Sequence, residues 1–375
     1  MTHPAKSPDA VKVGIVGCGN ISGQYFSHAP IFPMVDIVAC ADLNPETARA
    51  QAEKYQIPNV LTVEELLSHP DIEIVVNLTI PQAHVPLALQ ALANGKHTYA
   101  EKPLGLNREE AKPVLEAARA SNLRVGCAPD TFLGAGIQTA RKLIDDGTIG
   151  TPVAFTAFMM GRGHESWHPS PEFYYAPGGG PMFDMGPYYL TALLNLLGPL
   201  KRLTGSASIA IPDRTITSQP LNGKKITVTT PDHVVGTMEF AGGAVGTIIM
   251  SFATHHAQYD GEFPITIYGT DGTLRVPDPN GFDGRVQMVR AGGEWEDVPH
   301  TSPTGYGRMV GVADMAYAIR SGRPHRASLE QAYTVLDAMQ GFLDSSRTGQ
   351  AYVLSLPYER PALMPSDLPF GTLDV

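Results

Sequence analysis

Residues 178–198 combine two side chains that can handle a proton with the pattern of a buried helix. The stretch reads GGGPMFDMGPYYLTALLNLLG, and its leucines at 190, 193, 194 and 197 recur at helical spacing. A helical backbone would place Asp184 and Tyr188 one turn apart on the same side. Pro187 allows two interpretations of this helix. The helix begins near Gly186, or an earlier helix is kinked there. A carboxylate beside a phenol can orient a hydroxyl group and accept or relay its proton.

A glycine-rich stretch near the N-terminus has the pattern of a nucleotide-binding turn. VGIVGCGNISG places Gly17 and Gly19 after an expected strand and before an expected helix, with Ser22 at the third small position. Gly17 permits the tight turn, and Gly19 lets the backbone approach a pyrophosphate. The pyrophosphate would face the amides of Asn20 and Ile21 at the helix N-terminus.

An acidic residue at the end of the second expected strand bears on the choice of nucleotide. Asp42 stands where a carboxylate accepts hydrogen bonds from the ribose hydroxyls of a dinucleotide. It would repel a 2′-phosphate. The residues that follow it, LNPET, contain no arginine, and the next arginine along the chain is Arg49. NAD is therefore favoured over NADP.

The elements that must position these residues fall into two groups. Residues 11–128 alternate apolar strands with helical segments, which indicates right-handed crossovers and a parallel sheet. One of these helices would start after Asn44 as its cap, with Pro45 in the first turn. After residue 129, strands joined by short turns predominate, with two helices between Met309 and Ser346. We expect an α/β Rossmann domain over 1–128 and an α+β domain with a largely antiparallel open sheet over 129–375.

The composition excludes several classes of protein. A hydrophobic content of 43% with 17% charged residues predicts a packed core. The net charge of −10 argues against nucleic-acid and anionic-membrane partners, because both require a basic patch. The three cysteines, at 18, 40 and 127, lie in apolar stretches and indicate buried thiols in a reducing compartment. Without an N-terminal apolar core or a spanning apolar run, we expect a soluble cytoplasmic protein.

Four stretches together resemble the Gfo/Idh/MocA oxidoreductases, the family of glucose–fructose oxidoreductase and inositol dehydrogenase. They cover nearly the whole chain: GIVGCGNI, LTIPQAHVPLALQALANGKHTYAEKPL, GGGPMFDMGPYYLTALLNLLGP and SGRPHRASLEQAYTVLDAMQGFLDSSRTGQ. The resemblance implies a dinucleotide fold followed by an open sheet, with the substrate between that sheet and the nicotinamide. It implies hydride transfer between the nicotinamide and a substrate carbon.

The resemblance also assigns roles to residues of the first domain. Glu101 and Lys102 belong to an E-K-P element at the end of the fourth expected strand, and Lys102 would lie at the reacting carbon. Thr79, Pro81 and His84 match a T-x-P-x-x-H loop near the cofactor. For His84, packing or capping of its own helix is an equal alternative.

The acid–base group differs from the commonest family pattern. That pattern is D-x-G-x-H, and this chain has Tyr188 in place of the histidine, as some branches of the family have. Lys102 would stabilise the developing alkoxide, and Asp184 would orient the substrate hydroxyl or Lys102. A lysine cation would favour ionisation of Tyr188, whereas burial would make Lys102 the base, so both remain open.

A polar and aromatic loop is a candidate for substrate binding. GRGHESWHPSPEFYY over 161–175 contains Arg162, His164, Trp167 and His168 in a loop that should face the substrate pocket, with Arg162, Trp167 and His168 as the candidates. An aromatic ring beside polar groups suits a sugar. Asp130 departs from the asparagine–arginine pair often found at its place in the family, and we expect it near the nicotinamide or substrate. We expect no metal site, because His255 and His256 would point to opposite faces of a strand.

The leading hypothesis is an NAD-dependent dehydrogenase of a sugar, inositol or related polyol. Two alternatives are a glycosidase that uses a tightly bound NAD and a sensor that binds a dinucleotide and a sugar without turnover. Apolar residues alternate along VVGTMEF and VGTIIMSF in the second domain. They predict self-association through that sheet, as a dimer or a tetramer.

Overall fold

The chain forms two compact units that do not follow a single boundary along the sequence. The computed structural model describes residues 4–255 and 262–374. The first unit contains the chain up to Ala135, Thr301–Tyr333 and the residues from Pro361 on, and the second contains Gly136–His300 and Thr334–Arg360. The structure therefore differs from the expected division at 128/129, because two C-terminal segments return to the first unit. No helix in the two described ranges has the length and apolar composition needed to cross a membrane.

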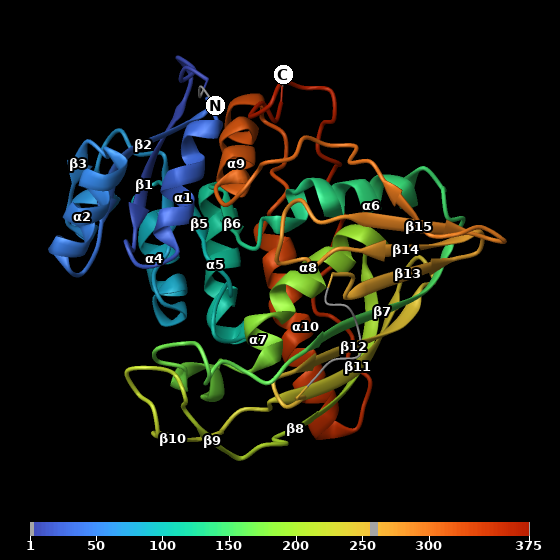
Figure 1. Ribbon diagram of the computed structural model, residues 1–375. Coiled ribbons are helices and arrows are strands. Elements are labelled where there is room, and N and C mark those ends of the chain that lie inside the picture. Colours follow the sequence, from blue (N-terminus) through green and yellow to red (C-terminus); the bar gives the residue numbers. More distant parts are fainter. Residues whose placement is uncertain (1–3, 256–261, 375) are drawn as a thin grey trace. The chain divides into compact units, whose positions relative to one another are not determined.

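The first unit is built on a six-stranded parallel sheet in the order β3-β2-β1-β4-β5-β6 (Figure 1). The strands are β1 Val11–Val16, β2 Val35–Ala41, β3 Asn59–Val60, β4 Ile74–Asn77, β5 His97–Ala100 and β6 Val125–Cys127. The strand order reverses between β1 and β4, which opens a crevice at the carboxyl ends of the strands. This is the predicted Rossmann sheet.

Helices connect these strands or pack against them, and three of the helices begin at a side chain that accepts from a free backbone amide. They are α1 Ser22–His28, α2 Pro45–Tyr55, α3 Val63–Ser68, α4 Pro81–Ala93, α5 Arg108–Ser121 and α9 Val310–Ser321, with the short 3₁₀ turns η1 Ala29–Ile31 and η2 Thr131–Leu133. Asn44 caps α2 as predicted, since its side chain accepts from the amide of Glu46. Thr62 and Glu65 form a capping box at the start of α3.

Close packing explains why a late segment of the chain belongs to the first unit. A methyl group added at Gly126 of β6 would lie 2.6 Å from the terminal carbon of Met315 on α9. The amide of Cys127 donates to the carbonyl oxygen of Ala327, 3.3 Å away. The sheet therefore continues its packing with a helix encoded far along the sequence. All three cysteines of the chain are buried free thiols.

The second unit is built on an eight-stranded sheet in the order β16-β15-β14-β13-β7-β12-β11-β8. Its described pairs are antiparallel except for β7 with β12, as expected for a largely antiparallel sheet. The strands are β7 Pro152–Met160, β8 Leu200–Ser208, β11 His233–Phe240, β12 Val245–Ser251, β13 Ile265–Gly269, β14 Gly272–Val276, β15 Val286–Arg290 and β16 Glu296–Val298. A separate ribbon pairs β9 Asp213–Thr215 with β10 Lys225–Thr227.

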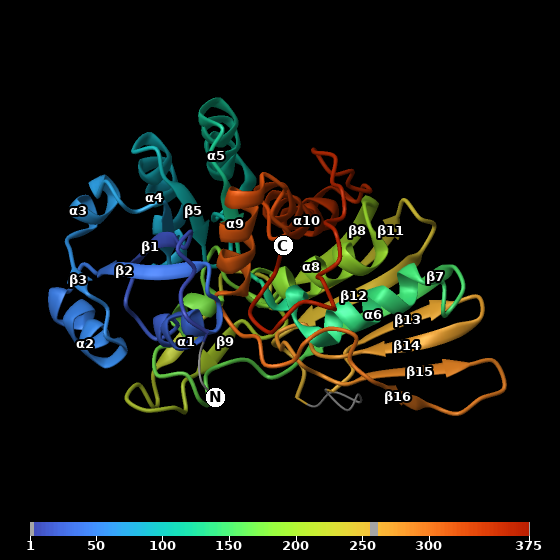
Figure 2. The same ribbon diagram turned by 90° about the horizontal axis from the view of Figure 1, so that it is seen from above.

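Helices cover one face of this sheet (Figure 2). They are α6 Ala135–Asp145, α7 Pro181–Asp184, α8 Gly186–Leu197 and the second half of α10 Leu329–Thr348, with the 3₁₀ turn η3 Glu172–Tyr175 at the sheet's end. Gly205 of β8 pairs with Gly236 of β11, and a methyl group at either would lie within 2.4 Å of Phe342 on α10. Gly236 thus makes room for the ring of Phe342, and Gly205 for its backbone, which lets α10 pack closely on the sheet.

The opposite face of the sheet carries a row of threonines. Register aligns one threonine from each of five neighbouring strands across this face, namely Thr204, Thr237, Thr247, Thr156 and Thr266. An adjacent row consists of Val235, Ile249 and Phe158, all partly exposed. Residues that point to the helical face, such as Phe155, Ile248 and Ile267, are fully buried. The face with the threonine row is therefore rich in β-branched residues and accessible in the part of the chain that the structure describes.

Candidate active site

The residues predicted to bind a dinucleotide gather at the carboxyl edge of the parallel sheet (Figure 1). The glycine turn follows β1, Asp42 follows β2, the Thr79 loop follows β4, and Glu101 and Lys102 follow β5. Their strands surround the point where strand order reverses. Open parallel sheets bind ligands at this place.

The two glycines of the turn have different surroundings. Gly17 has φ +96°, and a methyl group there would lie 2.7 Å from the carbonyl carbon of Leu78. Glycine is therefore required at position 17 by the protein's own backbone. A methyl group at Gly19 would meet no protein atom within 4 Å, so nothing in the fold excludes a side chain there. The amides of Asn20 and Ile21 have no acceptor among the described residues. These features fit a pyrophosphate that approaches the backbone closely.

Two side chains hold this turn in shape. Ser22 is fully buried, and its hydroxyl donates to the carbonyl oxygen of Gly19 at 2.7 Å. The Asp42 carboxylate accepts from the amides of Cys18 and Asn44, both at 2.8 Å. Each carboxylate oxygen keeps a second lone pair for a further donor. Asp42 is thus oriented by the turn itself, in a way that fits recognition of ribose hydroxyls.

His84 joins two loops of the candidate site. Its ring nitrogens lie 3.1 Å from the carbonyl oxygen of Thr79 and 2.6 Å from that of Pro103, and only 1% of the residue is exposed. The Thr79 hydroxyl donates to Asn77 at 2.7 Å, and Pro81 opens α4. These contacts fit the packing alternative for His84, while cofactor contacts of Thr79, Pro81 and His84 stay predictions.

Glu101 fixes the turn that carries Lys102. One carboxylate oxygen accepts from the hydroxyl of Tyr25 at 2.9 Å, and the other accepts from the amide of Lys102 at 3.1 Å. Burial, reinforced by the nearby Glu101, raises the pKa of Tyr25 well above its usual value. The phenol therefore remains a donor, and Glu101 acts from within the protein on the position of Lys102.

Asp130 is enclosed in the first unit. Its two oxygens lie 3.1 Å from a guanidinium nitrogen of Arg308 and 3.1 Å from the amide of Gly311, and the residue is 0% exposed. Burial raises its pKa, and Arg308 opposes that rise. Asp130 thereby anchors the start of α9. The expected contact with nicotinamide or substrate would require an opening to this carboxylate, and it stays a prediction.

The second unit presents a histidine–aspartate pair. α7 ends at Asp184 and α8 begins at Gly186, so the chain forms two short helices with a break at Met185. Nε2 of His164 lies 3.1 Å from Oδ2 of Asp184, with the two side chains 16% and 15% exposed. Tyr188 is buried in the first turn of α8. Nothing in the sequence indicated that His164 was the partner of Asp184.

The other residues of the 161–175 loop differ in exposure. Trp167 is 60% exposed, with its ring 5.4 Å from that of His168. Nδ1 of His168 accepts from the amide of Ser170 at 3.1 Å, and the side chain of Arg162 is exposed. Their predicted contacts with substrate stay predictions.

A buried arginine that sequence reasoning missed anchors this loop. Arg214 donates to Glu165 at 2.7 Å, to Asp232 at 2.8 Å and to the carbonyl oxygen of Arg162 at 2.7 Å. Burial alone would raise the pKa of Glu165, but hydrogen bonds from Tyr175 and Arg214 lower it. Burial and the bond to Glu165 raise the pKa of Tyr175. The loop is thus held by an internal ionic network.

In the ranges 4–255 and 262–374, no group of three or more His, Cys, Asp or Glu side chains could hold a metal ion. His255 is described, whereas His256 lies outside the described residues.

Two parts of the chain match known protein families. Residues 11–128 match an oxidoreductase family with an NAD-binding Rossmann fold. Residues 137–275 match the GFO/IDH/MocA C-terminal domain. The two matches fall in the two units of the structure.

Three of the curated relatives are named for sugars or sugar derivatives. The chain is 26% identical to levoglucosan dehydrogenase of Pseudarthrobacter phenanthrenivorans, over 70% of this chain and 73% of that protein. It is 26% identical to 1,5-anhydro-D-fructose reductase of Ensifer adhaerens, over 70% and 74% of the two chains. It is 28% identical to dTDP-3,4-didehydro-2,6-dideoxy-alpha-D-glucose 3-reductase of Streptomyces antibioticus, over 88% and 94%.

Solved structures share the fold. An NAD-binding oxidoreductase from Klebsiella pneumoniae has a TM-score of 0.81 at 22% identity, covering 93% of this chain and all of that one. Levoglucosan dehydrogenase in complex with NADH and levoglucosan has a TM-score of 0.79 at 22% identity, with the same coverage.

Proposed function

Because the chain belongs to the Gfo/Idh/MocA oxidoreductase family, we propose that it is an NAD-dependent dehydrogenase of a sugar, inositol or related polyol. The observation that carries the proposal is the carboxyl edge of the parallel sheet. There, an open glycine turn follows β1, the oriented Asp42 follows β2, and Lys102 follows β5 of the same sheet. The names of the relatives support a carbohydrate as the substrate class.

The proposed chemistry divides between the bound cofactor and the protein. A bound nicotinamide would accept the hydride from the substrate C–H bond. Lys102 stabilises the alkoxide that develops as the hydroxyl loses its proton. Asp184 orients the hydroxyl, and Tyr188 accepts or relays the proton, with Lys102 as the alternative base. Asp184 and Tyr188 lie in the second unit and Lys102 in the first, so their joint action on one substrate is part of the proposal.

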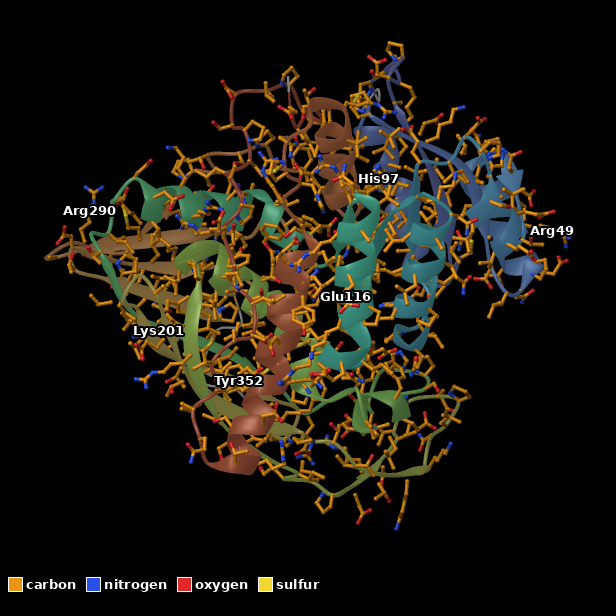
Figure 3. All side chains as sticks on the ribbon, turned by 180° about the vertical axis from the view of Figure 1, so that it is seen from behind. Arg49, His97, Glu116, Lys201, Arg290 and Tyr352 are labelled. Carbon is orange, nitrogen blue, oxygen red and sulfur yellow. The ribbon has the colours of Figure 1, made fainter. Side chains whose placement is uncertain are left out.

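Charge at the end of β2 supports NAD rather than NADP. The carboxylate of Asp42 would repel a 2′-phosphate. Arg49, the first arginine after it, lies on the outside of α2 (Figure 3) and pairs with Glu46. We expect kcat/KM to be higher with NAD⁺ than with NADP⁺, and Asp42→Ala to reduce that preference. An unchanged preference in the variant would contradict this role of Asp42.

Exposed and aromatic groups support binding of a hydroxyl-rich ring. Trp167 presents its indole to solvent beside His168, and Arg162 is exposed in the same loop. An aromatic face packs against the C–H face of a sugar, while neighbouring polar groups bind its hydroxyls. We propose that this loop contributes to substrate binding.

The accessible face of the eight-stranded sheet supports self-association. It joins the threonine row with Val235, Ile249 and Phe158, and no described helix covers it. An uncovered sheet face with apolar side chains suits packing of two copies about a twofold axis. We propose a homo-oligomer formed through this face.

The experiment that tests the function mixes the purified protein with NAD⁺ and a panel of aldoses, inositols and sugar acids, and follows NADH absorbance. Substrate-dependent formation of NADH supports the dehydrogenase. No NADH formation despite measured NADH binding, with an equally broad NADP⁺ panel, would contradict it. Release of a sugar from glycosides would then indicate the glycosidase with bound NAD. Binding without any turnover would indicate the sensor.

A further inference from the structure

The pairing of His164 with Asp184 determines which ring nitrogen carries a proton. Oδ2 of Asp184 lies 3.1 Å from Nε2, and an ionised carboxylate can only accept a hydrogen bond. Nε2 of His164 therefore donates, and in the neutral ring Nδ1 carries the lone pair. Within the described ranges, Nδ1 has no hydrogen-bond partner. The ring is thus held at one nitrogen and can gain a proton at the other.

The backbone of the loop fixes His164 independently of its ring. Gly163 has φ +105°, and a methyl group there would lie 2.2 Å from the hydroxyl oxygen of Tyr175. That hydroxyl accepts from the amide of His164 at 2.9 Å and donates to Glu165. Arg214 completes the anchor through Glu165. The position of the imidazole is therefore set by a buried network rather than by a flexible loop.

Aromatic rings enclose the imidazole on the sides away from Asp184. Ring centroids of Tyr174, Phe252 and Trp167 lie 4.0, 4.6 and 5.1 Å from that of His164. Such surroundings limit the contact of the pair with water, since the side chains of His164 and Asp184 are 16% and 15% exposed. A less polar environment strengthens the interaction of the ring with the carboxylate.

We infer that His164 is a positioning residue for the oxidation, acting through Asp184. The neutral ring fixes the carboxylate through Oδ2 and leaves its negative charge available to orient the substrate hydroxyl. This inference rests on the proposed function of Asp184.

Two variants of His164 separate positioning from packing. His164→Phe keeps the ring volume but removes the hydrogen bond, and we expect kcat to fall by about 100-fold because the carboxylate loses its orientation. His164→Gln can still donate to Asp184 through its side-chain amide. We expect it to restore most of the kcat that His164→Phe loses.

His300→Phe is the matched control. Nε2 of His300 lies 3.1 Å from a backbone carbonyl oxygen, that of Gly284, in the same unit. We expect its kcat to match that of wild type. Equal losses in His164→Phe and His300→Phe would overturn the inference. A His164→Gln variant as slow as His164→Phe would also overturn it.

A readout without turnover distinguishes failure of this inference from failure of the proposed function. Nitrogen-15 NMR of the histidine side chains of the full chain reports which ring nitrogen is protonated. We expect His164 at pH 8 to be the Nε2–H tautomer, and Asp184→Ala to shift it toward the Nδ1–H form. A Nδ1–H tautomer in the wild type would overturn the pairing. If no sugar is oxidised, the proposed function and this kinetic role fail together, whereas the tautomer still decides whether Asp184 holds Nε2–H.

Discussion

At the scale of single residues, Gly17 and Gly19 show how identical residues two positions apart are required for different reasons. Gly17 is confined by the backbone of Leu78 and by its positive φ. Gly19 has open space around it. One glycine is required by folding, and the other fits contact with a ligand.

We therefore expect opposite phenotypes from the two alanine variants. Gly17→Ala should lower the free energy of unfolding by more than about 1 kcal/mol, because alanine resists positive φ and meets backbone atoms. Gly19→Ala should unfold like the wild type but lose about 1–3 kcal/mol of NADH binding free energy, which is about 5- to 150-fold in Kd. Urea unfolding and NADH fluorescence titration measure the two effects. Unchanged NADH affinity in Gly19→Ala would contradict the proposed cradle.

Lys102 allows a second test at the residue scale. Lys102→Ala should leave NADH affinity near the wild-type value while kcat falls by about 100- to 1,000-fold, because a cation that stabilises the alkoxide is lost. Lys112→Ala, which removes an exposed lysine paired with Glu109, serves as the control. Turnover by Lys102→Ala at the wild-type rate would exclude the role proposed for this lysine.

At the scale of elements, the 161–175 loop depends on a residue from the small β9–β10 ribbon. Arg214 lies on β9, and its guanidinium is fully buried between Glu165 and Asp232. Removing it leaves two carboxylates without their shared cation. A buried ion pair broken on one side destabilises strongly, since the remaining charge is uncompensated.

Arg214→Met should lower the free energy of unfolding at pH 7 by about 3–5 kcal/mol. The pKa of Glu165 is lowered in the folded protein, so its stabilisation is present above its unfolded pKa of about 4.3 and is lost as pH falls through the folded pKa. The difference in free energy of unfolding between Arg214→Met and the wild type should therefore be smaller at pH 3 than at pH 7. Urea unfolding at both pH values measures this difference.

Arg202→Met controls for loss of an ordinary arginine, because Arg202 pairs with Glu239 at the surface. It should change the unfolding curve little at either pH. If Arg214→Met lowered the free energy of unfolding equally at pH 3 and pH 7, loss of the charge pair would not be the cause of its destabilisation.

At the scale of the whole molecule, the accessible face of the eight-stranded sheet leads to a prediction about assembly. Ile249 lies on β12 between β7 and β11, near the middle of that face. An arginine there would place a charge in a packed interface, where a desolvated charge without a partner is costly. We expect the wild type to be a dimer or tetramer and Ile249→Arg to be a monomer, by light scattering after gel filtration.

Val353→Arg is the control for that experiment, because Val353 is 67% exposed and lies outside the sheet. It should keep the wild-type mass. A monomeric wild type, or an Ile249→Arg variant with unchanged mass, would contradict assembly through this face.

One local feature of the fold could have been predicted from the sequence but was not. The stretch TVEE at 62–65 has the spacing of a capping box, and the structure shows that box at the start of α3. The two helices between Met309 and Ser346 were predicted correctly as α9 and α10. The sequence did not predict that α9 belongs to the first unit. That placement depends on the packing of Met315 against Gly126, which are far apart along the chain.

The sequence by itself determined the features that depend on neighbours along the chain. Strand–helix alternation, the glycine turn with Asp42 and the Asn44 cap all follow from periodicity and backbone preference over a few residues. Only the tertiary structure decided the partners of buried charges. His164 with Asp184, Arg214 with Glu165, and Arg308 with Asp130 each bring together residues distant in sequence. The local sequence pattern does not indicate such pairs. Which charged side chains pair depends on which side chains the packed elements bury together.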